Sequence, residues 1–151
     1  MGSNTIHGSL YNKKALNETT VRICSGGDDQ ALCVCDLSLT YNFDGRLVLS
    51  GDRQSQITRE LSFSAIKGLV QFHCTEDTYL LSVGYSQKLA LWKVESDGQP
   101  LLQDEMSVDI GDVNCLAAFP LELGFDLMVA VGGMGVEHFV LQTKKLLLDK
   151  A

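Results

Sequence analysis

The residues in this chain that could carry out chemistry are two adjacent aspartates, five cysteines and three histidines. Asp28-Asp29 has the form of a carboxylate pair, which could hold a metal ion or act in acid–base catalysis. The pair follows Ser-Gly-Gly, however, and an aspartate in such a turn ordinarily accepts backbone hydrogen bonds that fix the turn. We therefore interpret Asp29 as a turn residue and expect the pair to have a structural role.

The histidines and cysteines do not form a recognisable reactive pattern. His7, His73 and His138 are widely separated, and no Ser-His-Asp or Cys-His spacing indicates an activated nucleophile. The cysteines are odd in number and include no Cys-x-x-Cys pair, so neither a disulfide framework nor a zinc site is indicated. Cys33 and Cys35 would share one face of a strand, where packing is a simpler interpretation than redox chemistry. The sequence predicts no catalytic residue, metal or cofactor.

A glycine-rich segment, Gly132-Gly133-Met134-Gly135, has the composition of a phosphate-binding loop. No helix is expected after it, and no Lys-Ser or Lys-Thr pair closes it, so the chemistry of a phosphate loop is missing. We interpret these residues as turn glycines that adopt positive φ angles.

The most informative feature of the sequence is internal repetition, which identifies repeat folds before any other signal. Residues 25–37 (SGGDDQALCVCDL) align with residues 82–94 (SVGYSQKLALWKV), because Ser, Gly, Gln and Leu recur at matching offsets and the apolar residues keep their phase. A weaker third copy covers residues 130–141, with a turn that is one residue shorter. The chain therefore contains three related units.

Each unit has the pattern of an apolar strand, a tight polar turn and a second strand with alternating faces. A further short strand precedes the hairpin, at residues 68–74 in the second unit and 112–118 in the third. After the second hairpin, a turn at 96–98 leads to a predicted outer strand at 100–103. Four strands per unit is typical of a β-propeller blade.

The repeat interval is longer than usual for such blades. The glycine at the end of the first hairpin strand recurs after 57 and then 48 residues, whereas WD40 repeats have a period of about 40 to 45 residues. We place the first excess in a loop at 41–54, which leaves 56–63 as the outer strand, and the second in a lengthened connection at 119–124.

The first unit resembles the WD40 family, because SGGDDQALCVCD follows the consensus S-G-S-x-D-G-x-[apolar]-x-[apolar]-W-D almost position by position. Members of that family link a loop histidine, a strand serine, a turn aspartate and a strand tryptophan by hydrogen bonds. Cys35 stands where the first unit should have tryptophan, and Ser86 stands where the second should have aspartate. The resemblance thus implies a partial set of structural positions, namely His7, Ser25, Asp29, Ser82 and Trp92.

A closer resemblance is carried by residues 109–115 (DIGDVNC) and 131–137 (VGGMGVE), together with His7-Gly8-Ser9, the SGGDD segment and Leu91-Trp92-Lys93. These residues resemble the C-terminal part of the WD repeat-containing protein 6 family. Members of that family are non-catalytic partners of the methyltransferase that 2′-O-methylates the wobble nucleotide of certain tRNAs. The resemblance implies a scaffold that binds this enzyme and meets tRNA indirectly or through missing blades. The alternative is a WD40 adaptor for another complex, such as a ubiquitin ligase or a signalling assembly.

The expected fold is all-β, with about three WD40 blades in an incomplete ring. The approximate blades are residues 7–63, 64–106 and 107–143, followed by a C-terminal tail at 144–151. Propellers need about four to eight blades, so three cannot close a ring. We therefore expect a fragment or a short form of a longer protein, with apolar faces exposed at both ends.

Charge and hydropathy exclude several classes of function. A net charge of −7 disfavours direct binding to DNA or to an RNA backbone, because such binding depends on clustered lysine and arginine. We expect a cytoplasmic protein without a membrane span or a secretory signal. A propeller enzyme would need convergent carboxylates or histidines on its innermost strands. The strands expected there, 69–72 and 113–116, contain none.

Overall fold

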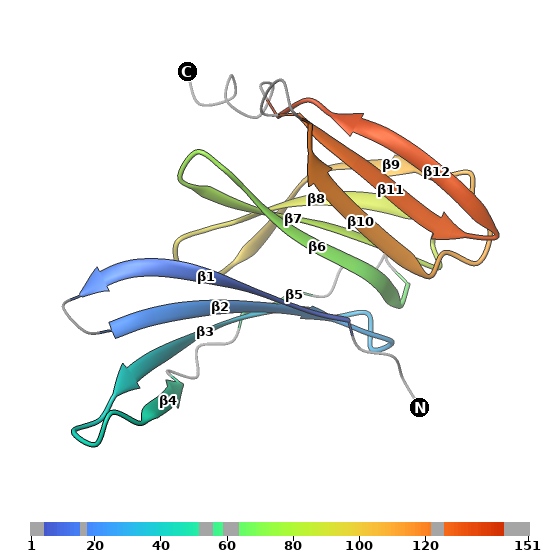
Figure 1. Cartoon of the computed structure of the whole chain (residues 1–151). Coiled ribbons are helices and arrows are strands. Elements are labelled where there is room, and N and C mark those ends of the chain that lie inside the picture. The colour runs from blue at the N-terminus through green and yellow to red at the C-terminus, as the bar shows by residue number, and fades with distance from the viewer. Residues whose placement is uncertain (1–4, 16–17, 52–55, 59–63, 122–125, 144–151) are drawn as a thin grey trace.

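The fold is built from β-strands alone. The computed structural model describes residues 5–15, 18–51, 56–58, 64–121 and 126–143, and all twelve elements within these ranges are strands (Figure 1). They form three separate sheets in which every strand pair is antiparallel. The predicted all-β class is therefore confirmed.

The three sheets follow one another along the chain. The first sheet contains β1 (Thr5–Ala15), β2 (Glu18–Gly26), β3 (Leu32–Tyr41), β4 (Leu47–Gly51) and β5 (Gln56–Thr58). The second contains β6 (Ile66–Cys74), β7 (Asp77–Gly84), β8 (Lys88–Val94) and β9 (Pro100–Ser107). The third contains β10 (Cys115–Pro120), β11 (Leu127–Gly133) and β12 (Gly135–Leu141).

The second sheet lies between the other two, and both of its faces are covered (Figure 1). As a result β7 is buried continuously from Thr78 to Gly84 and does not show the alternation of a half-exposed strand. Its two faces contribute to two apolar cores. The core shared with the first sheet contains Cys24, Leu32, Val34, Ile66, Leu69, Leu80, Ala90, Trp92 and Val94. The core shared with the third contains Phe72, Cys74, Tyr79, Leu81, Val83, Leu89, Leu91, Val108, Ile110, Val113, Leu127, Val129 and Val131.

The internal repeat of the sequence reappears in the backbone. In both of the first two hairpins a glutamine ends the turn with a positive φ, 62° at Gln30 and 56° at Gln87. Its amide donates to the glycine three residues earlier, over 3.2 Å in the first hairpin and 3.0 Å in the second. Each turn also bonds to the chain that enters the next sheet, through Ile66 N to Gly27 O and Val108 N to Gln87 O. The same local unit therefore occurs twice.

The loop predicted at 41–54 is wrong in part, because it contains β4. Gly45 adopts a φ of +71°, and its amide donates to Asn42 O over 2.9 Å. The Asp-Gly pair therefore makes a hairpin turn, which returns the chain to pair with the far end of β3. The outer strand predicted at 56–63 is present as β5 at 56–58, and residues 59–63 lie outside the described ranges.

The first strand of the third sheet begins later than the predicted 112–118. Asp112 has a φ of 48°, which interrupts the extended backbone, and β10 starts at Cys115. Val113 is fully buried in the core instead of standing in a strand. β10 continues through Pro120, so the connection predicted at 119–124 also starts too early, and residues 122–125 lie outside the described ranges.

The prediction that all the glycines at 132–135 are turn residues is wrong for two of them. Gly132 and Gly133 belong to β11, and of the three glycines only Gly135 has a positive φ, at 145°. A Cβ atom on Gly133 would approach Gly111 O to 2.5 Å. Close packing of backbone on backbone, not turn geometry, requires glycine there.

Candidate functional site

Trp92 and Ser82 form a hydrogen bond inside the core shared by the first and second sheets. Trp92 Nε1 donates to Ser82 Oγ over 2.8 Å, and the two residues are only 2% and 3% exposed. They lie on neighbouring strands, β8 and β7, and on the same face of the sheet. A buried indole N–H needs an acceptor, so the bond holds the second hairpin together in a position that solvent does not reach.

The other positions that the sequence resemblance singled out, His7, Ser25 and Asp29, lie in the first sheet, whereas Ser82 and Trp92 lie in the second. Asp29 Oδ1 accepts a hydrogen bond from the backbone amide of Ala31 over 3.2 Å, within the turn itself. Ser25 is half-buried on β2, opposite Cys33. His7 stands opposite Cys24 in the β1–β2 ladder, and its side chain is outside what the structure describes.

The other member of the carboxylate pair, Asp28, connects two sheets. Its carboxylate is ion-paired with Lys67 of β6, whose ammonium also lies 4.7 Å from the centre of the Tyr85 ring. The hydrogen bond that Lys67 donates to the Asp28 carboxylate raises the pKa of Lys67 and keeps the ammonium charged. Asp28 and Asp29 therefore act separately, one between sheets and one within a turn.

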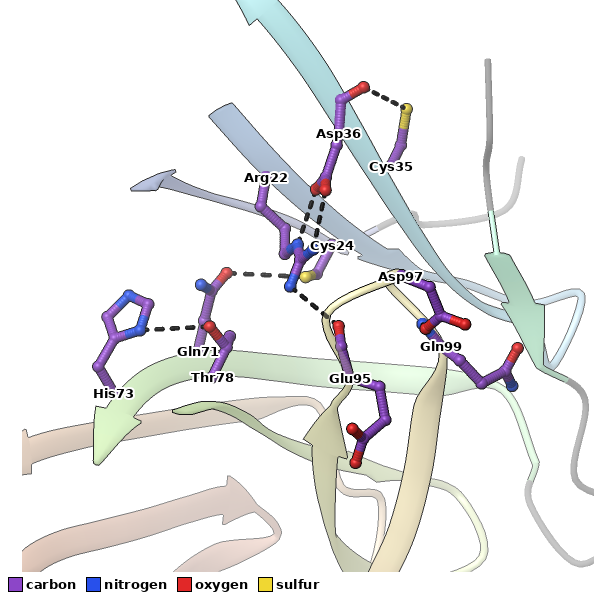
Figure 2. A network of polar contacts seen from close by, with 10 residues as sticks. All are labelled: Arg22, Cys24, Cys35, Asp36, Gln71, His73, Thr78, Glu95, Asp97 and Gln99. Atoms are coloured by element: carbon purple, nitrogen blue, oxygen red, sulfur yellow. Dashed lines mark hydrogen bonds and ion pairs between the residues drawn. The ribbon is translucent and has the colours of Figure 1, made fainter. Parts of the chain in front are cut away.

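A buried arginine stands at the boundary between the first and second sheets, where sequence reasoning found none. Arg22 is 4% exposed and donates twice to Asp36, from Nε to Oδ1 over 2.7 Å and from Nη2 to Oδ2 over 2.8 Å (Figure 2). The two residues are directly opposite each other on β2 and β3. Nη1 reaches the carbonyl oxygen of Glu95 over 3.4 Å, across to the second sheet. One sequence signal could have revealed the pair: Arg22 shares the core-facing phase of Cys24.

Beside this pair the two sheets leave an open cleft of about 230 Å³. Four carboxylates line it, and the charge of Arg22 is balanced by Asp36. Lys93 Nζ is 4.0 Å from Asp77 Oδ2 and 3.3 Å from Glu95 Oε1. The ammonium therefore offsets part of the negative charge of these two carboxylates. The cleft favours a cationic group over a phosphate. Its lining consists of Thr20, Arg22, Asp36, Glu76, Asp77, Thr78, Val94, Glu95 and Ser96.

The cysteines near this cleft have the character of packing residues. Burial raises the pKa of the Cys24 thiol to about 12, and its Sγ donates to Gln71 Oε1 over 3.6 Å (Figure 2). Desolvation, together with the neighbouring Cys35, also raises the pKa of Cys33. Both thiols are protonated at neutral pH, which makes them weak nucleophiles and weak metal ligands.

Among the described residues, no three His, Cys, Asp or Glu side chains are grouped so that they could hold a metal ion. No helix in the described part of the chain is long and apolar enough to cross a membrane.

Comparison with known proteins gives no family for the chain. No protein-family model matches it, and no curated protein sequence matches it significantly.

Proposed function

We propose that the three sheets are three consecutive blades of a WD40 β-propeller. The observation that carries this proposal is the repeated connection between sheets. β6 contacts β1 and β2 on one side and β10 on the other, so the first strands of successive sheets are neighbours. Each hairpin turn of the first two sheets also accepts a backbone hydrogen bond from the chain that enters the next sheet. Further sheets added by the same rule would extend the array at either end.

On this fold the chain acts as a non-catalytic scaffold in the cytoplasm, and its partner is a tRNA 2′-O-methyltransferase that modifies the wobble position. The partner assignment is supported by the motif resemblance at 109–115 and 131–137. The structure adds that the two conspicuous carboxylates are engaged in a turn and an ion pair, and that two of the thiols have raised pKa values. We therefore assign these residues a structural role in the proposed scaffold.

Contact with the methyltransferase itself fits this segment better than contact with tRNA phosphates. The chain carries a net charge of −7, and four carboxylates line the cleft between its first two sheets. A lysine or arginine of a protein partner would gain attraction there, whereas a phosphate would be repelled. Contact with tRNA therefore belongs to blades outside this chain or to the enzyme.

The experiment removes the gene for the whole protein from cells and measures ribose methylation of the wobble nucleotide by mass spectrometry. We expect methylation to be lost and to return with the wild-type gene. The double substitution Glu76→Lys and Asp77→Lys should reduce rescue and co-purification of the enzyme, whereas Asp44→Lys in an exposed turn should not. Unchanged methylation in the deleted cells would remove the assignment. Affinity purification with mass spectrometry would then identify an adaptor role in another complex.

A further inference from the structure

The β3–β4 hairpin of the first sheet is longer than its counterpart in the second. Leu37 and Val94 occupy the same position of the internal repeat, and in the second sheet the turn begins directly after Val94. In the first sheet Leu37 pairs with Gly51, and residues 38–41 pair with 47–50 before the chain turns. Four more residues in each strand add about 13 Å to the hairpin. Its end lies at the periphery of the molecule, away from the second and third sheets (Figure 1).

The turn that closes the longer hairpin has the same backbone as the turn of the second sheet. Asn42 N donates to Arg46 O over 3.0 Å, and Gly45 N donates to Asn42 O over 2.9 Å. In the second sheet Glu95 and Gly98 donate the corresponding two bonds, both over 2.9 Å. The amide of Arg46 also donates to Asn42 Oδ1 over 3.1 Å. The longer hairpin therefore ends in an ordered turn, which lowers the conformational entropy lost when a partner binds.

The side chains of the two turns differ. Phe43 stands where the second turn has Ser96, and it is fully exposed. Tyr41 and Leu47 lie directly opposite each other, so their side chains share one face of the hairpin, and they are 71% and 55% exposed. We call Tyr41, Phe43 and Leu47 the aromatic tip. Large apolar side chains that gather on a protein surface mark an interaction site.

The size of the aromatic tip indicates how it binds. A buried aromatic side chain covers about 150 to 250 Å², so the tip covers on the order of 500 Å² when it is fully buried. A stable interface takes about 800 Å² from each partner. The tip is therefore too small to hold two proteins together alone, and it suits an anchor that enters a pocket within a larger interface.

Charge distinguishes between the possible occupants. Thr20 lines the carboxylate cleft and pairs with Ser38, the first residue of the hairpin extension, so the cleft and the tip lie at the same end of the first sheet. An anionic bilayer that approached this end would be repelled by the carboxylates and by the net charge of −7. A second copy of the chain would bring the same carboxylates. A neutral or basic protein surface does not meet this repulsion.

We propose that the aromatic tip anchors a protein partner. Phe43 enters an apolar pocket of that protein, and Tyr41 and Leu47 pack on the rim of the pocket. None of these three residues lines the carboxylate cleft. The inference therefore goes beyond the proposed function and does not depend on the methyltransferase assignment.

Site-specific photo-crosslinking of the full chain in cells tests the proposal. The photoreactive amino acid p-benzoylphenylalanine replaces Phe43 or, as a control, Asp97 in the exposed turn of the second sheet. After irradiation, mass spectrometry identifies the crosslinked molecule and the peptide that carries the crosslink. We expect one partner protein, crosslinked at least about tenfold more from position 43 than from position 97, through a peptide that lines an apolar pocket.

Substitutions of Phe43 then test whether the contact is an apolar anchor. Isothermal titration calorimetry measures binding of the purified full chain to the protein that was crosslinked. Phe43→Ser should weaken binding at least about tenfold, Phe43→Leu should weaken it less, and Asp97→Ala should leave it unchanged. Because Phe43 is fully exposed, both of its variants should keep the midpoint of urea denaturation, which separates loss of contact from loss of fold.

Several outcomes would overturn the inference. These are no crosslink from position 43, equal crosslinking from 43 and 97, or unchanged affinity of Phe43→Ser. Crosslinks confined to phospholipid would indicate a membrane contact, and crosslinks to a second copy or to the chain itself would indicate packing of this protein on itself, so both would contradict the proposal. A partner other than the methyltransferase leaves the inference intact. Unchanged wobble methylation in deleted cells removes only the methyltransferase assignment, so the two proposals can fail separately.

Discussion

At the scale of single residues, Arg22 and Asp36 form a bidentate ion pair at the boundary between the first and second sheets. Arg22 is almost fully buried, while the Asp36 side chain is 38% exposed. Water therefore screens part of the attraction, and the pair serves chiefly to neutralise a guanidinium that the packing of two sheets has removed from solvent. Removing one partner is consequently more damaging than removing both.

Asp36→Ala should lower the free energy of unfolding by about 2 to 3 kcal/mol, because Arg22 keeps its burial and loses its counter-charge. Replacing both residues, as Arg22→Met with Asp36→Leu, should recover most of that loss. Urea denaturation followed by the fluorescence of Trp92 measures both changes, since it is the only tryptophan. Asp44→Ala, in an exposed turn, is the control. A double variant that is less stable than Asp36→Ala would contradict this account.

The buried thiol of Cys24 predicts a dependence of stability on alkaline pH. Burial raises its pKa from 9.0 to about 12 in the folded chain, and unfolding restores the lower value. Because the folded pKa is the higher one, the contribution of the thiol is fully present below pH 9 and is lost as the pH rises toward 12.

Urea denaturation across this pH range should therefore show a fall in the free energy of unfolding, and Cys24→Ala should make the fall shallower. Cys115→Ala is the matched control, because Cys115 is exposed. If the two variants had the same pH dependence, the thiol of Cys24 could not be the titrating group.

At the scale of elements, Gly84 lets β7 lie close to the chain that enters the second sheet. A Cβ atom on Gly84 would collide with the carbonyl oxygen of Ala65, which is backbone and cannot move aside easily. Gly111 is different, since the nearest atom to its Cβ position is Met134 Sδ at 3.8 Å, an ordinary contact. The two positions form a matched pair.

Gly84→Ala should destabilise the chain by at least about 1 to 3 kcal/mol, because the entry to the second sheet must shift to accommodate the methyl group. Gly111→Ala should be close to neutral, within about 0.5 kcal/mol. Thermal and urea denaturation of both variants would measure the difference. Equal effects of the two substitutions would show that close approach is not the reason for glycine at 84.

The elements also show what the sequence could and could not predict. The hairpins were predictable because their apolar phase is the same in strands that face a core, and the Gln30 and Gln87 turns repeat in both sequence and backbone. The start of β10 was not, because it depends on the positive φ of Asp112, a residue that nothing in its neighbours marks. Strand β4 was missed because an Asp-Gly pair signals a loop and a hairpin equally well.

The candidate site was less predictable than the fold, because its parts come from different sheets. Arg22 and Asp36 are far from Glu76 and Glu95 in the sequence, and only the packing of the first sheet on the second brings them to one cleft. The periodicity of apolar residues along the sequence predicts individual strands, but it does not predict which strands pack together. The partners of a polar residue across two sheets follow from the tertiary structure alone.

At the scale of the whole molecule, the second sheet is the element on which the other two depend. It has two covered faces, while the first and third sheets each pack one face on it. In a linear array of this kind, stability is a sum of unit terms and interface terms, so the unit with two interfaces is the most stable. The ends of the array should open first.

Native-state hydrogen exchange tests this order directly. Amides of β7 should be the slowest to exchange, and those of β2 and β11 should be faster. Leu80→Ala should accelerate exchange mainly in the first and second sheets, because Leu80 belongs to the core between them, and Val83→Ala mainly in the second and third. Slower exchange in β11 than in β7 would contradict this order. Equal acceleration of exchange in all three sheets by both substitutions would show that the sheets unfold as one cooperative unit. In that case the number of packed faces of a sheet would not determine which sheet exchanges first.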